Sequence, residues 1–441
     1  MRNSITHARR VARLAGVVAD RVRARRDDRR AADAERSRAP RAALVYDGVT
    51  DRSLVLAGIE VGERHPEVVL VIDEVRRGAA FAGVQTALAA AIGYADRTGR
   101  DLRVVMTRST SRGNSAERAA ALIAERFPGR FAGRGPVEVV TRESIPAAVF
   151  AADTVWIATY WKTAHALDVA ARAGVVDPRR VVYLVQDHEP GFQPWSTAFA
   201  VASSTYRAGF TLCVNSEPVA AALRQTEGVA VASGLVFAPE LDRAGIDRAA
   251  AVRAASTRTA ARVLFYARPS KPRNMYVLGV AALAAAAAQL RDAGVIAEFV
   301  SAGEQHEAVE LGTGDVLRSL GTLDWNSYFE VLGETDVVLS LQQSPHPSHP
   351  PLDAAESGAR VVTNDLGGAR AGLHPSIGAV PADPATLGTA VARAVLAGLG
   401  MTSEGAPAAA ERVASRSDLG RPLTDVLDEL AMSVEPGVRL R

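Results

Sequence analysis

Short runs of aliphatic, β-branched residues recur along the chain, and segments with helical spacing separate them. The runs are too apolar to face water on one side. Continuous hydrophobicity with helices in between is typical of parallel strands that are covered on both faces. The pattern therefore predicts a doubly wound α/β fold. The runs lie at 67–73, 101–106, 137–141, 153–158, 180–185, 210–214, 262–267, 296–302, 336–341 and 360–365.

An Ala- and Arg-rich stretch at 241–260 interrupts this alternation, which then restarts. A chain of 441 residues is also longer than a typical single domain. We therefore expect two Rossmann-like domains that face a cleft, at 42–240 and 261–410, with 241–260 as a linker. The final segment, 411–441, contains a predicted helix at 417–430 that returns to the first domain.

Composition and cysteine use indicate an ordinary globular protein. The chain is 48% hydrophobic and 23% charged, and its single cysteine, Cys213, lies in an apolar run. A buried thiol and the impossibility of a disulfide within the chain suit a reducing compartment. The longest apolar stretch, 278–290, is too short to span a bilayer, and no signal-peptide pattern opens the sequence. We expect a cytoplasmic protein.

Residues 1–41 form a basic arm with thirteen arginines against five acidic residues. Val11, Leu14, Val18 and Val22 recur near helical spacing, which favours a basic amphipathic helix that contacts anionic lipid at the inner face of the membrane. A solvated, partly disordered arm is an equal alternative. The remaining chain is mildly acidic, so nucleic-acid binding is not expected.

Cofactor fingerprints are absent from the sequence. It contains no G-x-G-x-x-G and no G-x-x-x-x-G-K-[ST], since Trp161 and Ser270 precede the only two lysines. No Asp-x-Asp ends a predicted strand either. Dehydrogenase and P-loop functions lose their support, and we expect no bound cofactor and no metal. The charge of any phosphate must then be met by the protein itself.

The loop "RPSKPRN" follows the first strand of the second domain. It places Arg268, Lys271 and Arg273 at the carboxyl end of that strand, where ligands of doubly wound sheets bind. Lysine supplies a point charge and arginine a fork, so together they can hold a diphosphate. A solvated basic loop is an equal alternative.

A second cluster lies in the segment "SPHPSHPPLDAAESGARVVTND" at 344–365. Its paired prolines can open a helix with Asp353 in the first turn, and the helix start is a ready anion site. Alternatively, Asp353 merely complements the helix dipole. His346 and His349 have no further His or Cys nearby, so a metal site is disfavoured.

The first domain also places chemical groups at strand ends. Gly83 turns the chain into a helix where the backbone can approach a ligand closely. Asp187, His188 and Glu189 follow the run at 180–185 and are candidates for catalysis. Residues 160–162, Tyr-Trp-Lys, can shape the acceptor side, although the tryptophan can equally be packing.

Three motifs, "YLVQDHEP", "FYARPSKPRN" and "SPHPSHPPLDAAESGARVVTN", resemble in this order the GT-B nucleotide-sugar glycosyltransferases of the retaining family 4 type. The likeness is strongest to bacterial rhamnosyltransferases of surface-glycan assembly and covers roughly residues 66–400. It implies that Arg268 and Lys271 bind the phosphates and that Asp353 binds the ribose. It also places base contacts on the loop of Gly321, Thr322 and Leu323.

The sequence departs from that family at one pair of carboxylates. Family 4 usually has two glutamates separated by seven residues, but the first position falls on Pro345 and the second is Asp353. The carboxylate that contacts the sugar is thus missing or replaced. A deoxysugar such as rhamnose needs fewer polar contacts there, so the resemblance implies dTDP-rhamnose as donor.

The expected reaction is transfer of a sugar to a hydroxyl of a surface polysaccharide or lipid-linked glycan. Arg268, Lys271 and the N–H groups near Ser348 and His349 would stabilise the leaving diphosphate without a metal. With retention, Asp187 or Glu189 positions the acceptor. With inversion, Asp187 is the candidate general base. A non-catalytic carbohydrate- or nucleotide-binding protein and a nucleotide-sugar epimerase on the same scaffold are the alternatives.

Overall fold

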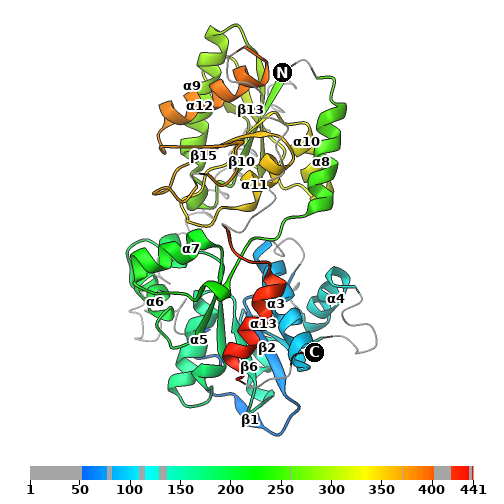
Figure 1. Cartoon of the computed structure of the whole chain (residues 1–441), viewed down its shortest axis with the longest axis vertical. Coiled ribbons are helices and arrows are strands. Elements are labelled where there is room, and N and C mark those ends of the chain that lie inside the picture. Colours follow the sequence, from blue (N-terminus) through cyan, green and yellow to red (C-terminus); the bar gives the residue numbers. More distant parts are fainter. Residues whose placement is uncertain are drawn as a thin grey trace, which may run out of the picture. The chain divides into compact units, whose positions relative to one another are not determined.

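The computed structural model places most of the chain in two α/β lobes (Figure 1). Predictions that concern residues 1–41 lie outside the described residues. Within the part that is described, no helix is both long enough and apolar enough to cross a membrane. The structure describes residues 52–76, 82–108, 115–128, 137–258, 260–370, 372–401, 419–436 and 440.

The first lobe contains a seven-stranded sheet in the order β4-β3-β2-β6-β7-β8-β9, in which all neighbours are parallel. The strands are β2 (Glu67–Ile72), β3 (Asp101–Met106), β4 (Glu138–Val140), β6 (Val155–Ala158), β7 (Val181–Val185), β8 (Thr211–Asn215) and β9 (Val236–Phe237). A small two-stranded sheet pairs β1 (Glu60–Gly62) with β5 (Val149–Ala151). The helices are α3 (Ala82–Thr98), α4 (Ala116–Arg126), α5 (Trp161–Arg172), α6 (Thr197–Thr205) and α7 (Glu217–Ala222).

Both faces of this sheet are buried, which explains the apolar runs. Along β2, Val68 and Leu70 pack into one hydrophobic cluster with α3 and α4. Val69 and Val71 pack into a second cluster with α5 and α7 on the opposite face. Successive strand residues point to opposite faces, so a strand covered on both sides needs an apolar residue at every position.

The second lobe repeats this plan with a seven-stranded sheet in the order β12-β13-β11-β10-β14-β15-β16. Only the edge pair β12–β13 is antiparallel in this sheet. The strands are β10 (Ala261–Ala267), β11 (Ala297–Gly303), β12 (Val309–Glu310), β13 (Val316–Ser319), β14 (Val337–Leu339), β15 (Arg360–Asn364) and β16 (Ile377–Val380). The helices are α8 (Arg243–Ala255), α9 (Tyr276–Asp292), α10 (Trp325–Gly333), α11 (His349–Glu356) and α12 (Pro384–Gly398). The predicted fold of two doubly wound, Rossmann-like domains is confirmed.

The segment predicted as a linker, 241–260, is instead largely helix α8 of the second lobe. Asp242 caps the helix, since its carboxylate accepts a hydrogen bond from the Gly245 N–H at 2.9 Å. Ile246 and Ala249 are buried against α10. The prediction was wrong because α8 buries few side chains, so its sequence shows little hydrophobic periodicity. At Gly245 a Cβ would lie 2.3 Å from the Phe329 ring, so close packing requires glycine.

The last helix, α13 (Leu423–Val434), lies beside α3 in the first lobe (Figure 1). Its buried side chains, among them Leu423, Val426 and Leu430, complete the hydrophobic cluster on that face of the sheet. The returning chain is anchored next to β9: the Ala238 N–H donates to the Arg421 carbonyl at 2.8 Å. The first lobe is therefore assembled from two separate stretches of the sequence.

The single cysteine has the predicted environment. Cys213 lies in β8, fully buried, and burial raises the pKa of its thiol to about 12. A thiol with so high a pKa carries almost no thiolate at neutral pH and is not a nucleophile.

Candidate active site

A cavity of about 450 Å³, here called the first cavity, is lined by loops from both lobes at the carboxyl ends of their strands. This is where doubly wound sheets bind ligands. Of the residues predicted from the sequence, five do not line it: Trp161, Lys162, His188, Lys271 and Gly321. Those that line it are Gly83, Asp187, Glu189, Arg268, Thr322, Leu323, Ser348, His349 and Asp353.

Two arginines bring positive charge to the first cavity. Arg268 follows the end of β10, and its Nε lies 3.6 Å from a carboxylate oxygen of Glu304. Arg273 stacks on the Phe192 ring of the first lobe, with 4.3 Å between the guanidinium carbon and the ring centroid. Burial lowers the pKa of Arg273, and the charge of Asp187 opposes this shift. Both guanidiniums therefore face the same cavity.

Lys271 does not take the predicted place beside Arg268. It begins a short 3₁₀ turn at Pro272–Asn274, and its N–H donates to the Arg268 carbonyl at 2.9 Å. Arg273, in this turn, lines the cavity. Burial alone would raise the pKa of Glu304, but hydrogen bonds from Ser270 and the charges of Arg268 and Lys271 lower it overall. Arg268 and Arg273 line the cavity and Lys271 does not, and the phosphate-binding role of Arg268 and Lys271 stays a prediction.

The start of helix α11 contributes fewer backbone donors than its sequence suggested. Ser348, just before the helix, has a left-handed backbone with φ of 69°, and its N–H donates to Nδ1 of His346 at 3.0 Å. The two prolines that follow His349 have no N–H at all. Burial, with help from Arg370 and Arg273, lowers the pKa of His346 to about 4, so the imidazole is neutral. Arg268 and Arg273 are thus the main positive charges among the residues that line the first cavity.

The wall of the first cavity formed by α11 contains a buried carboxylate. Asp353 of α11 is 2% exposed and accepts a hydrogen bond from the Tyr328 hydroxyl of α10 at 3.2 Å. Nearby, the Thr322 hydroxyl donates to the Gly303 carbonyl at 3.0 Å. Gly321 has φ of 69°, and a Cβ there would lie 2.6 Å from the Gln305 amide oxygen. Gly321 therefore shapes the predicted base loop, and Thr322 and Leu323 line the cavity.

Asp187 joins the two lobes. It follows β7, is buried, and accepts short hydrogen bonds from the Ser344 hydroxyl at 2.5 and 2.6 Å. The His188 N–H donates to it as well, at 2.8 Å. Burial raises the pKa of Asp187 although these donors favour the carboxylate. The side chain predicted to act on the acceptor is thus held by a serine of the second lobe.

Glu189 is a buried anchor for helix α5. Its carboxylate accepts hydrogen bonds from the Trp161 N–H, at the helix start, and from the Tyr183 hydroxyl at 3.0 Å. Burial raises the pKa of Glu189 to about 8, against the effect of those donors. Tyr160 lines the cavity, whereas Trp161 is buried packing and Lys162 lies over the Trp161 ring at 5.3 Å.

We expect Glu189 to make stability depend on pH in a defined direction. Because its pKa in the folded state is raised, the proton-linked stabilisation is complete at low pH and is lost as pH rises towards about 8. His346 has the opposite linkage, but its effect ends near its ordinary pKa. Between pH 6.5 and 8.5 the wild type should therefore lose more stability than Glu189→Gln in urea unfolding. Parallel pH profiles of the two proteins would contradict this assignment.

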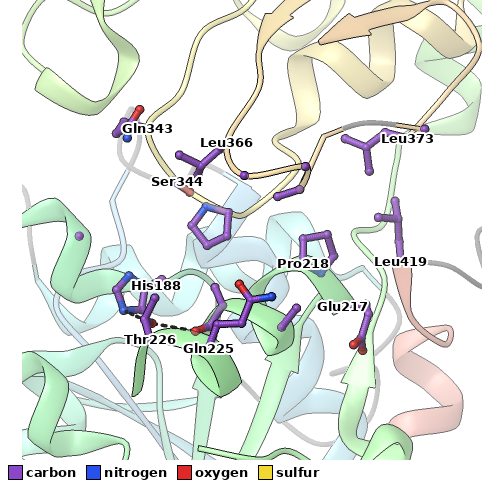
Figure 2. A pocket seen from close by; sticks show the side chains of 18 of the residues that line it. His188, Glu217, Pro218, Gln225, Thr226, Gln343, Ser344, Leu366, Leu373 and Leu419 are labelled. Carbon is purple, nitrogen blue, oxygen red and sulfur yellow. Dashed lines mark hydrogen bonds between the residues drawn. The ribbon is translucent and has the colours of Figure 1, made fainter. Parts of the chain in front are cut away.

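His188 points away from the first cavity. Its Nε2 lies 2.9 Å from a Glu227 carboxylate oxygen and 3.3 Å from the Thr226 hydroxyl. It lines a separate cavity of about 750 Å³, here called the second cavity (Figure 2). Among the described residues no group of three or more His, Cys, Asp or Glu side chains could hold a metal ion.

Sequence reasoning missed several residues that organise the site. Arg370 is 1% exposed and donates to the Ser344 carbonyl at 2.7 Å and to the Asn364 side-chain oxygen at 2.8 Å. It thereby fixes the loop whose serine holds Asp187. Ser344 itself lies 157 positions from Asp187, so no local pattern connects them. The only available signal was an arginine in the glycine-rich stretch "DLGGARAG", which directly follows the strand predicted at 360–365.

The architecture of the described residues is the GT-B fold, with two Rossmann-like domains and the site at their facing strand ends. Solved structures with this fold include an α,α-trehalose-phosphate synthase (UDP-forming) from Burkholderia vietnamiensis, with TM-score 0.53 and 12% identity over 83% of this chain and 99% of that one. A second is the Burkholderia xenovorans enzyme of the same name in complex with glucose-6-phosphate, with TM-score 0.51 and 11% identity over 84% of this chain and 100% of that one. Such low identity shows the fold alone.

Two family models match the chain. The N-terminal domain of WsaF matches residues 67–214, and the C-terminal domain of WsaF matches residues 261–392. The first match falls in the first lobe and the second in the second lobe. The chain is also 32% identical over 232 residues to the O-antigen biosynthesis protein RfbC of Myxococcus xanthus, a match that covers 52% of this chain and 17% of that protein. These findings together support a glycosyltransferase of the GT-B type.

Proposed function

We propose that the chain is a glycosyltransferase that moves a sugar from a nucleoside diphosphate to a hydroxyl of a surface polysaccharide or lipid-linked glycan. The observation that carries this proposal is that Arg268 and Arg273 face one cavity together with the buried carboxylate of Asp353. Two guanidinium forks suit a diphosphate, and a buried carboxylate suits the hydroxyl groups of a ribose. The fold, the WsaF domains and the name of the RfbC relative support the same class.

The chemistry asked of the protein is stabilisation of the leaving diphosphate. Arg268 and Arg273 would neutralise the negative charge that develops as the glycosidic bond breaks, each such donor contributing about a hundredfold in rate. Both cations are supplied by the protein and are held in place before the reaction, so no metal is assigned to this step. The buried, neutral His346 keeps the neighbouring loop in place without adding charge.

We propose retention of configuration, with the acceptor hydroxyl approaching from the face of the leaving group. Asp187 is then the group that positions this hydroxyl once Ser344 releases it. Burial raises the pKa of Asp187, and a proton acceptor is more effective when its pKa lies closer to the pH at which the protein works. The donor proposed is dTDP-rhamnose, because the chain's motifs resemble those of rhamnosyltransferases. Pro345, which stands where the related family has its first glutamate, lines the second cavity and not the first.

Binding of nucleotide sugars tests this function directly. Saturation of one site at about a hundred times its Kd adds roughly 2.7 kcal/mol of stability, so dTDP-rhamnose should raise the melting temperature of the full chain by several degrees. Asp353→Asn should lose most of that rise, whereas the exposed surface variant Asp292→Asn should keep it. No stabilisation by any nucleotide sugar in a panel would contradict the proposal.

A transfer assay separates the enzyme from the non-catalytic alternative. Incubation with dTDP-rhamnose and membrane glycan from a bacterium should release dTDP in proportion to the sugar incorporated. Stabilisation by the nucleotide sugar without any release of dTDP would favour a binding protein on the same scaffold. Conversion of the nucleotide sugar without an acceptor would indicate an epimerase.

A further inference from the structure

The second cavity, of about 750 Å³, takes no part in the function described so far. Its volume lies within the range of small-molecule and cofactor sites. Residues from both lobes line it, including Gln225 and Thr226 after α7, and Gln343 and Leu366 in loops of the second lobe (Figure 2). It therefore has the size and enclosure of a ligand site.

The charges around this cavity exclude an anionic ligand. None of the residues that line it is an arginine or a lysine, whereas two of them, Glu217 and Glu356, carry carboxylates. Glu217 pairs with Arg224 at 3.4 Å, and Glu356 with Arg243 at 2.8 Å. A diphosphate would meet no cation on these walls, and its desolvation would go uncompensated. The nucleotide belongs in the first cavity.

The polar groups of the second cavity suit hydroxyl groups. The side-chain amides of Gln225 and Gln343, one from each lobe, make no hydrogen bond to any of the described residues. An amide offers both donors and an acceptor, as does a hydroxyl group. Pro218, Leu366 and Leu373 add apolar side chains to the wall of the same cavity. Uncharged donors and acceptors around apolar walls fit a pyranose, which has hydroxyl edges and apolar C–H faces.

Residues that line the two cavities contact one another directly. Asp187 lines the first cavity, Ser344 lines the second, and the serine hydroxyl donates to the carboxylate. His188, the next residue along the chain, lines the second cavity. The Gln343 N–H also donates to the carbonyl of Arg273 at 2.7 Å. A ligand that contacts Gln343 in the second cavity is thus separated from Arg273 of the first cavity by one hydrogen bond.

From these observations we propose that the second cavity binds the acceptor glycan as an uncharged pyranose chain. Its hydroxyl reaches the donor where Asp187 and Ser344 meet. This assignment rests on the proposed glycosyltransferase function and names the acceptor subsite of that function. In this proposal, arginines bind the nucleotide on one side of the Asp187–Ser344 contact. Neutral side-chain amides bind the glycan on the other side.

Methyl NMR of the full chain tests this proposal without any need for turnover. Leu366, Leu373 and Leu419 line the second cavity, so their labelled methyl groups report on it, and Leu399 at the end of α12 is a reference outside it. Titration with methyl α-L-rhamnopyranoside, and with the corresponding glucoside, galactoside and mannoside, should shift the three reporters but not Leu399. Addition of dTDP alone should leave them in place.

A matched pair of variants gives the residue-level test. Gln225→Ala removes one amide from the wall and should weaken glycoside binding by about fivefold, the effect of one lost hydrogen bond. Gln289→Ala removes an exposed amide on α9 that bonds only Thr389, at 3.1 Å, and should bind the glycoside as the wild type does. In a transfer assay Gln225→Ala should raise the KM for the glycan acceptor and leave the KM for the nucleotide sugar unchanged.

Several results would overturn the assignment. Reporters that stay unshifted by every glycoside, while dTDP still stabilises the protein, would leave the donor site standing and remove the acceptor site. Shifts of the same reporters by dTDP would give the second cavity to the nucleotide. Equal loss of binding in Gln225→Ala and Gln289→Ala would show that the amide has no specific role. Failure of dTDP to bind, with glycoside shifts intact, would instead count against the donor chemistry.

Discussion

Arg273→Ala should lower kcat/KM for the nucleotide sugar by at least about a hundredfold, because a preorganised cation is lost from the site where diphosphate charge develops. Arg268→Ala should do the same, since both guanidiniums face the first cavity. Lys271→Ala should change kcat/KM by no more than a few fold, because that side chain does not line the cavity. The three alanine variants thus separate the structural assignment from the one expected from the sequence.

Controls make this comparison a test of position as well as charge. Arg273→Lys keeps one positive charge but loses the fork and the stacking on Phe192, so it should recover only part of the lost rate. Melting temperatures of all variants should stay within a few degrees of the wild type, which separates lost catalysis from lost fold. A large loss in Lys271→Ala with near-normal turnover in Arg273→Ala would restore the sequence-based assignment.

Arg103→Ala should destabilise the first lobe by about 3–5 kcal/mol, the usual penalty for breaking a buried ion pair from one side. Arg103 is 1% exposed, and its Nε lies 3.4 Å from a carboxylate oxygen of Glu67, which is 2% exposed. The guanidinium also donates to the Val149 carbonyl at 2.9 Å and lies 5.0 Å from the centroid of the Phe150 ring. Thermal and urea unfolding would both show the loss.

A double variant distinguishes two causes of this loss: the unpaired charge left on Glu67 and the packing lost with the Arg103 side chain. Arg103→Met with Glu67→Gln removes both charges while keeping much of the volume, so it should recover most of the stability lost in Arg103→Ala. The neutral glutamine can still accept hydrogen bonds from the Ala151 N–H and the Thr154 hydroxyl, which Glu67 accepts at 3.0 and 3.2 Å. A double variant no more stable than Arg103→Ala would show that packing dominates.

The sequence predicted the central strands well and the edge strands poorly. The run predicted at 101–106 is β3, and the one at 262–267 is β10 to within one residue, because strands buried on both faces are mostly apolar. Strands such as β13 and β16 went unpredicted. They lie at or near a sheet edge, bury only some of their residues, and are four residues long, so no continuous apolar run marks them.

In the candidate site, too, the sequence predicts what depends on neighbouring residues and does not predict what depends on residues far apart in the chain. A parallel strand fixes which residues stand at its carboxyl end, so Arg268 and Asp187 could be placed from the sequence. Which of two neighbouring cations faces the cavity depends on the 3₁₀ turn at Pro272–Asn274, which the sequence did not reveal. The serine that holds Asp187 comes from the other lobe, and only the fold brings it there.

The return of the last helix to the first lobe constrains the order in which the two lobes can fold during synthesis. During synthesis on a ribosome, the part of α3 that packs against α13 stays uncovered until Leu423, Val426 and Leu430 have left the exit tunnel. The lobe translated first is therefore finished last, after the second lobe has had time to fold. A nascent chain halted before residue 423 would expose apolar side chains of α3. We expect a chaperone to bind the chain at this stage.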